Sequence, residues 1–364
     1  PRTGPRLGLS PLFRWGLLLL LGVPASVFLR WQQADPLFVF LAASLAMLPL
    51  AGLLGKATEQ LADRSGPVVG GLLNATFGNA AELIIALVAL RSGMVDLVKA
   101  SITGSILGNL LLILGLAFVA GGLRSPILRF NRTGAGMAAA MLALAVAGLV
   151  FPALFHLLHP GTEGTRIGLS ELRLTEAVAI LLALTYGASL LFSLRTHRAV
   201  FAVEQHPESP AGLWKPRVAV LVLAVATAGV VVESEILVGA IEPVTRSLGL
   251  SETFLGLVVI PLIGNAAEHG AAVSVARAGK TDLSLQIALG SSTQIALLVA
   301  PLLVFAALAM GNPLSLVFTP LEVIALGIAT GVVAMITLDG ESHWFEGVQL
   351  LALYGMVAAA AYFL

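Results

Sequence analysis

The chain has 364 residues, of which 58% are hydrophobic and only 11% are charged, and its mean hydropathy is +0.97. These values exclude a soluble globular domain, and a formal net charge of zero argues against a nucleic-acid partner. The absence of cysteine excludes any role for disulfides or thiolates. Because the apolar runs are too long and continuous for an outer-membrane barrel, we expect an all-α polytopic membrane protein.

Apolar runs and the glycines, prolines and charges that separate them predict eleven transmembrane helices. The first run resembles a signal-peptide core, but we interpret it as a spanning helix because no convincing small-residue cleavage site follows before Trp31. In chain order the expected spans are 12–31, 36–61, 67–90, 95–120, 134–158, 173–194, 216–247, 251–276, 282–309, 314–338 and 343–364.

The loops between these spans carry unequal numbers of Lys and Arg. With the N-terminus placed inside, 14 of these residues lie on the inner side and 6 on the outer side. The positive-inside rule therefore favours a cytoplasmic N-terminus, and the odd number of spans puts the C-terminus outside. Residue usage rich in Ala, Leu, Gly and Arg hints at a bacterial genome, hence at a bacterial inner membrane.

One pentapeptide, Gly-Asn-Ala-Ala-Glu, occurs at 78–82 and again 186 residues later at 264–268. The same offset relates Gly93 to Gly279 and Asp96 to Asp282. The copies are five spans apart, and an odd number of spans reverses the direction in which the chain crosses the membrane. The two repeats must therefore have opposite orientations. We therefore expect one extra N-terminal helix plus two inverted five-helix repeats. The resulting segments are 1–35, the first repeat 36–194, a cytoplasmic loop 195–215 and the second repeat 216–364.

Each copy of the pentapeptide places a glutamate, Glu82 or Glu268, within an apolar span. A carboxylate at mid-membrane costs roughly 3 kcal/mol or more, so structure alone seldom retains two of them at matching places. The structural alternative for each is a neutral glutamate hydrogen-bonded to a backbone carbonyl. Pro261 and Gly264 should kink or unwind the second span, and carbonyls freed at such breaks are typical cation ligands in transporters. We expect the two glutamates to form one site.

Further polar side chains in these spans bear oxygen ligands that suit Ca²⁺, Na⁺ or Mn²⁺, whereas no His/Cys cluster indicates zinc or copper. Helical spacing should turn them to the bundle interior, although a single intramembrane Ser or Asn can also serve only as an interhelical contact. They are Asn79, Asn265, Ser105, Asn109, Ser291 and Gln294. His269, whose counterpart is Leu83, is either a hydrogen-bonded core histidine or a candidate for proton coupling. Glu235, inside the apolar stretch 230–240, is either a third buried acid and a candidate for proton coupling or a charge at the rim of the bundle.

The segments 71–82 and 264–269, with 290–294 and 338–342, resemble the calcium/proton exchangers, the cation/proton branch of the calcium/cation antiporter superfamily. The resemblance runs from about Leu50 to the end of the chain. It implies a Ca²⁺/H⁺ antiporter of eleven spans in which Glu82 and Glu268 carry the cation or the protons. It also implies that the six polar residues named above line the site. Ca²⁺ and H⁺ would be substrates, with no permanently bound cofactor.

Charge alone predicts exchange in such a site. Two ionised glutamates carry a charge of −2, which one Ca²⁺ or two protons neutralise. Only the empty site is charged, so only the empty site is unable to move across the membrane. Two Na⁺ would neutralise the pair equally well, so a Na⁺-driven exchanger on the same fold is the alternative. A serine protease using Ser291 or Ser292 with His269 is less favoured because no Gly-x-Ser-x-Gly elbow occurs. A Ca²⁺ channel is disfavoured by the inverted repeat.

Overall fold

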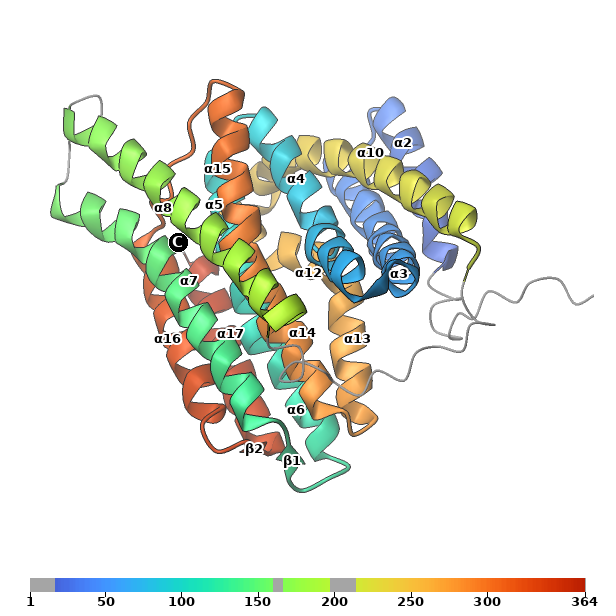
Figure 1. The fold of residues 1–364 in the computed structure, drawn as a ribbon. Coiled ribbons are helices and arrows are strands. Elements are labelled where there is room, and N and C mark those ends of the chain that lie inside the picture. Colours follow the sequence, from blue (N-terminus) through green and yellow to red (C-terminus); the bar gives the residue numbers. More distant parts are fainter. Residues whose placement is uncertain (1–16, 160–165, 197–213, 364) are drawn as a thin grey trace, which may run out of the picture. The chain divides into compact units, whose positions relative to one another are not determined.

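The computed structural model describes residues 17–159, 166–196 and 214–363, which are helical apart from short loops and one two-stranded ribbon (Figure 1). By length and composition, seven of the described helices can cross a membrane, or eight if a bent pair counts as one span. The other predicted spans correspond to the shorter apolar helices Leu18–Trp31 and Pro320–Ile336 and to the interrupted segment after Gly66. The helical membrane class is confirmed, and the number eleven stays a prediction.

Two compact units make up the chain, and each draws on both halves of the sequence. The first comprises Pro1–Val88, Glu204–Gly249 and Ile263–Ala267, and the second comprises Ala89–Val203, Leu250–Leu262 and Glu268–Leu364. The division into two repeats joined by a loop is therefore still an interpretation of the sequence. Most of the predicted loop 195–215 lies outside the described residues, as do the basic residues of segment 1–16.

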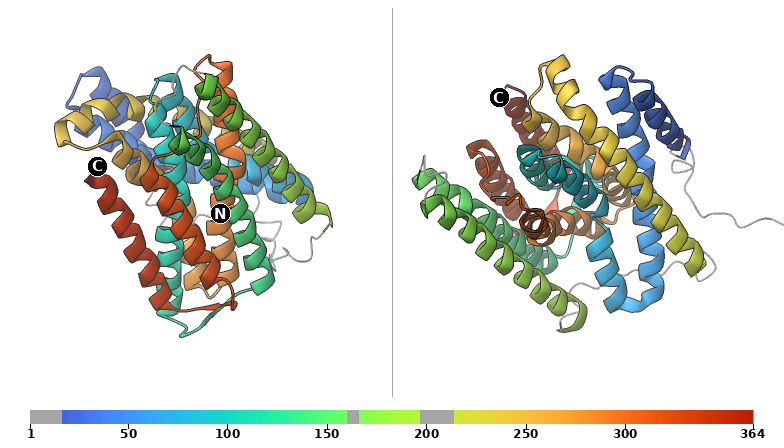
Figure 2. Two further views of the ribbon diagram at one scale, coloured as in Figure 1. Left: turned by 90° about the vertical axis from the view of Figure 1, so that its left-hand side faces the viewer. Right: turned by 90° about the horizontal axis from the view of Figure 1, so that it is seen from above.

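The first unit is built on a long pair of helices, α3 (Pro36–Phe77) and α10 (Pro216–Leu248), which lie side by side (Figure 2). The short helix η1 (Leu17–Leu21) and α2 (Gly22–Trp31) pack against α3. At Gly66 the chain of α3 adopts φ 76° and folds back, so that the backbone of Gly70 meets the Ala62 carbonyl. Only glycine adopts such a conformation without strain.

The second unit is a helical bundle (Figures 1 and 2). In it α5 packs against η5, α6 against α17, and α7 against both α8 and α16. The strands β1 and β2 form an antiparallel ribbon that pairs Leu128 with Ser342. From the first half of the sequence come α5 (Val95–Leu107), η2 (Gly108–Ile113), α6 (Leu114–Gly122), β1 (Leu128–Arg129), α7 (Arg132–Leu158), α8 (Arg166–Leu191) and η3 (Phe192–Thr196). From the second half come α11 (Glu252–Phe254), η5 (Leu255–Val259), most of α12 (Ile260–Gly264) and of α13 (Ala266–Arg277), α14 (Thr281–Gln294), η6 (Ile295–Val299), α15 (Ala300–Ala309), α16 (Pro320–Ile336), β2 (Glu341–Ser342) and α17 (Trp344–Tyr362).

Helix boundaries recur at the offset that relates the two pentapeptides. Helix α4 (Ala80–Arg91) and α13 (Ala266–Arg277) both have 12 residues and begin 186 positions apart. The π-helical turns η2 and η6 end at the matching residues Ile113 and Val299. Gly93 and Gly279, which follow α4 and α13, have φ of 79° and 81°. The matching sequences therefore produce matching helices, breaks and turns.

The predicted span 314–338 begins later than expected, because α16 starts at Pro320. Thr319 and Glu322 form a capping box, in which each side chain bonds the other residue's backbone N–H, and Pro320 occupies the first turn. The carboxylate of Glu322 is buried and also accepts a hydrogen bond from the Thr103 hydroxyl at 2.7 Å. Glu322 therefore fixes the start of α16 against α5, which is a structural role.

Two glycines allow α5 to approach η5 closely. A methyl group on Gly104 would overlap the Leu257 carbonyl oxygen, and one on Gly256 would lie 2.7 Å from Ala100 Cβ. Backbones can come this near only where side chains are absent, as is common at helix contacts in membranes. Gly290, which corresponds to Gly104 in the second copy, has open space around it.

We therefore expect Gly104→Ala to destabilise the protein and Gly290→Ala to leave it as stable or more stable. The first change overpacks a backbone contact, which typically costs about 1–3 kcal/mol, whereas the second only raises helix propensity. Thermal unfolding of the two purified variants, compared with the parent, is the measurement. Equal midpoints for both variants would contradict the close packing of α5 and η5.

Candidate functional site

The first pentapeptide lies at an interruption between two helices. Helix α3 ends at Phe77, Gly78 and Asn79 form a turn, and α4 starts at Ala80. Glu82 is therefore in the first turn of α4. A helix N-terminus carries a partial positive charge and orphan N–H groups, which favour an acidic side chain at this position by about 0.3–1 kcal/mol.

The second pentapeptide produces the same local structure. Helix α12 ends at Gly264, Asn265 forms the turn, and Glu268 lies in the first turn of α13. The two helices around this break are bent by 63°. The kink that Pro261 and Gly264 predict is thus confirmed, and each copy breaks its helix directly before the glutamate.

Within the first unit, the glutamate of one copy meets the glycine of the other. A methyl group on Gly264 would lie 3.3 Å from Glu82 Cγ and 3.5 Å from its Oε1, so the Glu82 side chain lies over bare backbone. Asn79 and Asn265, both in this unit, are 2% and 1% exposed. Two buried amides, a carboxyl group and an interrupted helix therefore belong to one compact unit.

Within the second unit, three predicted residues form a hydrogen-bonded chain. Asn109 Nδ2 donates to Ser291 Oγ over 3.1 Å, and the Ser291 hydroxyl hydrogen-bonds the Glu268 carboxyl group. Asn109 belongs to η2, from the first half of the sequence, whereas Ser291 and Glu268 come from the second half. Residues 182 positions apart thus meet in a buried polar contact, which helix packing alone brings about.

Two oxygens of this chain keep unused acceptor capacity. Glu268 Oε2 and Asn109 Oδ1 are buried and have no hydrogen-bond partner among the described residues. Such oxygens are ligands of the type that hard cations bind. No group of three or more His, Cys, Asp or Glu side chains gathers anywhere in the described ranges.

The remaining predicted residues occupy the neighbouring helices. Ser105 on α5 is buried, and Gln294 ends α14 in a half-buried position. His269 follows Glu268 on α13 and is half-buried, with an Nε2 atom that has no partner in the part of the chain that the structure describes. The roles of these three residues in cation binding and proton coupling stay predictions.

Of the two interpretations of Glu235, the buried acid is wrong. On α10 the side chain of Glu235 is exposed, whereas Glu233, two residues earlier, is fully buried. Glu233 and Glu235 lie in one apolar stretch, so the composition around them does not distinguish them. The rotation of α10 about its axis, set by its packing on α2 and α3, decides which side chain faces inward. The sequence signal that was available is that Glu233 and the small residue Gly229 share one face of a helix.

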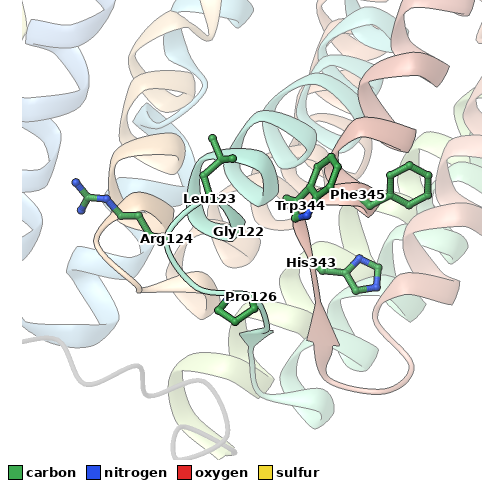
Figure 3. Close-up of a pocket in the computed structure, with 7 residues that line it drawn as sticks. All are labelled: Gly122, Leu123, Arg124, Pro126, His343, Trp344 and Phe345. Atoms are coloured by element: carbon green, nitrogen blue, oxygen red, sulfur yellow. The ribbon is translucent and has the colours of Figure 1, made fainter.

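A surface pocket of about 630 Å³ lies where α6 ends and α17 begins, and none of the residues named above lines it (Figure 3). It is lined by Gly122, Leu123, Arg124, Pro126, His343, Trp344 and Phe345. The Arg124 side chain points away from the rings of His343 and Phe345 (Figure 3). Because polar groups do not converge in it, the pocket is not the candidate site.

Comparison with known proteins finds a family match over nearly the whole chain. The family described as "Sodium/calcium exchanger protein" matches residues 36–195 and 218–363. A Ca²⁺/H⁺ antiporter of Synechocystis sp. is 44% identical over 95% of this chain and 96% of its own length. The Ca²⁺/H⁺ antiporter ChaA of Bacillus subtilis is 40% identical over 96% of this chain and 98% of its own length.

Solved structures agree with this similarity. The structure of native YfkE superimposes with a TM-score of 0.83, at 37% identity, over 96% of this chain and 100% of that one. A crystal structure of the H⁺/Ca²⁺ exchanger CAX superimposes with a TM-score of 0.72 over 97% of this chain and 93% of that one, at 16% identity. The second comparison, at this low identity, supports the fold alone.

The hydrogen-bonded chain in the second unit predicts unequal effects for two serines of α14. Ser291→Ala removes the hydroxyl between Asn109 and Glu268, and a buried polar group left unsatisfied costs about 1–3 kcal/mol. Ser284 is buried with a hydroxyl that has no partner among the described residues, so Ser284→Ala should be neutral or stabilising. Thermal unfolding of both variants measures the difference, and an equal loss in both would refute the contact.

Proposed function

Because the chain belongs to the sodium/calcium exchanger protein family, we propose that it is a Ca²⁺/H⁺ antiporter that exports cytosolic Ca²⁺ by alternating access. The choice of ion pair rests on the relatives at 40–44% identity, whose names state Ca²⁺/H⁺ antiport. The observation that carries the mechanism is the repeated helix break, which puts Glu82 and Glu268 in the first turns of α4 and α13.

Glu82 and Glu268 form the cation- and proton-binding pair in this proposal. The proximity of Glu82 to Gly264, four residues before Glu268 in the sequence, supports a pairing of the two pentapeptides. Asn79, Asn265, Ser105, Asn109, Ser291 and Gln294 supply further oxygens or orient the carboxylates. The bond from Ser291 to Glu268 supports that assignment, as does the Asn109 oxygen that has no partner among the described residues.

Charge neutralisation couples the two ions. With both glutamates ionised the site has a charge of −2, and either one Ca²⁺ or two protons bring it to zero. Moving the empty site through the membrane would carry the full penalty of an uncompensated charge, so only the loaded forms reorient. Ca²⁺ binding must displace the protons, since carboxylates bind metal in their ionised form. The two glutamates titrate as a coupled pair.

We further propose eleven spans in two inverted repeats, with α3 and α10 moving relative to the helices that hold the site. The matching bounds of α4 and α13 support a duplication. Ser292 Oγ lies 3.5 Å from the Ile106 carbonyl oxygen, and these positions are 186 residues apart. Ser292 and Ile106 are thus equivalent positions of the two repeats, and equivalent positions can touch only near the axis that relates the repeats. The N-terminus is then cytoplasmic, the C-terminus outside, and the membrane a bacterial inner membrane.

Neutralising either glutamate should abolish exchange. In everted vesicles, Glu82→Gln or Glu268→Gln should reduce ΔpH-driven ⁴⁵Ca²⁺ uptake to background, because one remaining carboxylate cannot balance Ca²⁺ or carry two protons. Glu341→Gln, which changes an exposed carboxylate paired with Arg129, should keep the parent rate and serves as the control. Uptake near the parent rate in either site variant would refute the mechanism.

Coupling to protons can be separated from coupling to Na⁺. Proteoliposomes with a pH gradient and no sodium should accumulate Ca²⁺ and release at least two protons per ion, because two protons replace its charge. Parallel ⁴⁵Ca²⁺ and pH-dye records give this ratio, and competition with Mn²⁺ and Na⁺ tests selectivity. Uptake that required a Na⁺ gradient would instead identify a Na⁺-driven exchanger on the same fold.

A further inference from the structure

A second buried carboxyl group lies in the first unit, outside the candidate site. Glu233 on α10 is 0% exposed, and its Oε1 lies 2.8 Å from the hydroxyl of Ser26 on α2, which is also 0% exposed. Its second oxygen, Oε2, is buried and has no partner among the described residues. This contact joins two helices that are 207 positions apart in the sequence.

Small residues bring the three helices α2, α3 and α10 together at this point. A methyl group on Gly22 would lie 3.0 Å from Ala46 Cβ, and one on Gly229 would lie 2.8 Å from Leu50 Cδ2. Ser26 follows Gly22, and Glu233 follows Gly229, by one helical turn on the same face. Glu233 and Ser26 therefore meet where α2 and α10 both pack on an apolar stripe of α3.

The charges on these helices do not compensate Glu233. It forms no ion pair within the described ranges, and on α10 its neighbours along the buried face, Val230 and Leu237, are apolar. Lys56 on α3 is paired with Glu59, and Arg246 on α10 with Glu242. The remaining charged residues of the three helices are all exposed: Arg30, Asp63, Arg64, Arg217 and Glu235.

Hydrogen-bond donors decide the protonation state of this contact. Ser26 Oγ lies 2.9 Å from the Val23 carbonyl oxygen, which can only accept, as well as 2.8 Å from Glu233. A serine hydroxyl has one hydrogen and can accept further bonds. If the Ser26 hydroxyl donates its hydrogen to the Val23 carbonyl, its contact with Glu233 is a hydrogen bond only when Glu233 carries a proton and donates it. If Glu233 were ionised, a buried charge would have a single donor and no ion pair, which is strongly unfavourable.

We propose that Glu233 is a proton-binding site distinct from Glu82 and Glu268, and that its proton, donated to Ser26, holds α2 against α3 and α10. This proton is structural and is not exchanged for the cation. Loss of it would leave an uncompensated charge between three helices and release α2. The proposal concerns the first unit alone and does not depend on Ca²⁺/H⁺ exchange.

The test uses the purified full chain and infrared spectroscopy. The carbonyl-stretching band of protonated carboxyl groups should lose intensity in Glu233→Gln and keep it in Glu235→Gln, a matched change of an exposed glutamate on the same helix. An unchanged band in Glu233→Gln would mean that Glu233 is ionised and would overturn the proposal. Since no transport is measured, failure here is separate from failure of the proposed antiport.

Thermal unfolding tests the same site by another route. Gln is the neutral isostere of the protonated acid, and its amide can donate to Ser26, so Glu233→Gln should unfold within a degree or so of the parent at acidic pH. As pH rises, the parent midpoint should fall relative to that of Glu233→Gln, because only the parent can ionise there. Glu233→Ala and Ser26→Ala should be less stable than the parent at acidic pH. If Glu233→Gln were as unstable as Glu233→Ala at every pH, an ionised glutamate would be required and the proposal would fail.

The position of α2 can be followed directly because the chain contains no cysteine. A spin label on Val27→Cys, an exposed position of α2 next to Ser26, reports the motion of that helix and should be equally mobile in the parent and in Glu233→Gln at acidic pH. The label should become more mobile when Glu233→Ala or Ser26→Ala is added. Equal mobility in all four backgrounds would contradict a tether between Glu233 and α2.

Discussion

Carboxylates placed inside a membrane must be neutralised, and this constraint accounts for much of the architecture. An isolated charge there costs several kcal/mol, and water is not available to reduce that cost. Both Glu82 and Glu268 are placed in the first turn of a helix that begins within an apolar span, where the backbone N–H groups oppose a negative charge. Full compensation still requires a cation or protons, and the exchange that we propose rests on that requirement.

Glycine and asparagine make these positions possible. In each copy the Gly-Asn pair ends one helix and starts the next, and the second break bends the chain by 63°. The bare backbone at Gly264 also lets the Glu82 side chain lie against it. The two copies are nevertheless not equivalent in their contacts. Ser291 bonds Asn109 and Glu268, and position 295, which corresponds to Asn109, is isoleucine.

Glu322, Glu268 and Glu233 have three different surroundings and hence three different chemistries. Glu322 accepts bonds from Thr103 and from Thr319, which satisfies both of its oxygens as a helix cap requires. Glu268 has one oxygen bonded to Ser291 and one without a partner among the described residues, which suits the ion exchange that we propose for it. Glu233 has one hydroxyl neighbour and apolar surroundings, which suits a group that keeps its proton.

The amino-acid sequence by itself determined the membrane class, most helix limits and the repeated glutamates, because long apolar runs and an identical pentapeptide are local signals. It also predicted the break at Pro261 and Gly264, since both residues weaken a helix wherever they occur. Tertiary structure alone decided that Glu233 and not Glu235 is buried, because the rotation of α10 depends on how Gly229 packs against Leu50. It also decided the bond between Asn109 and Ser291, since contacts between residues 182 positions apart arise only when the helices pack.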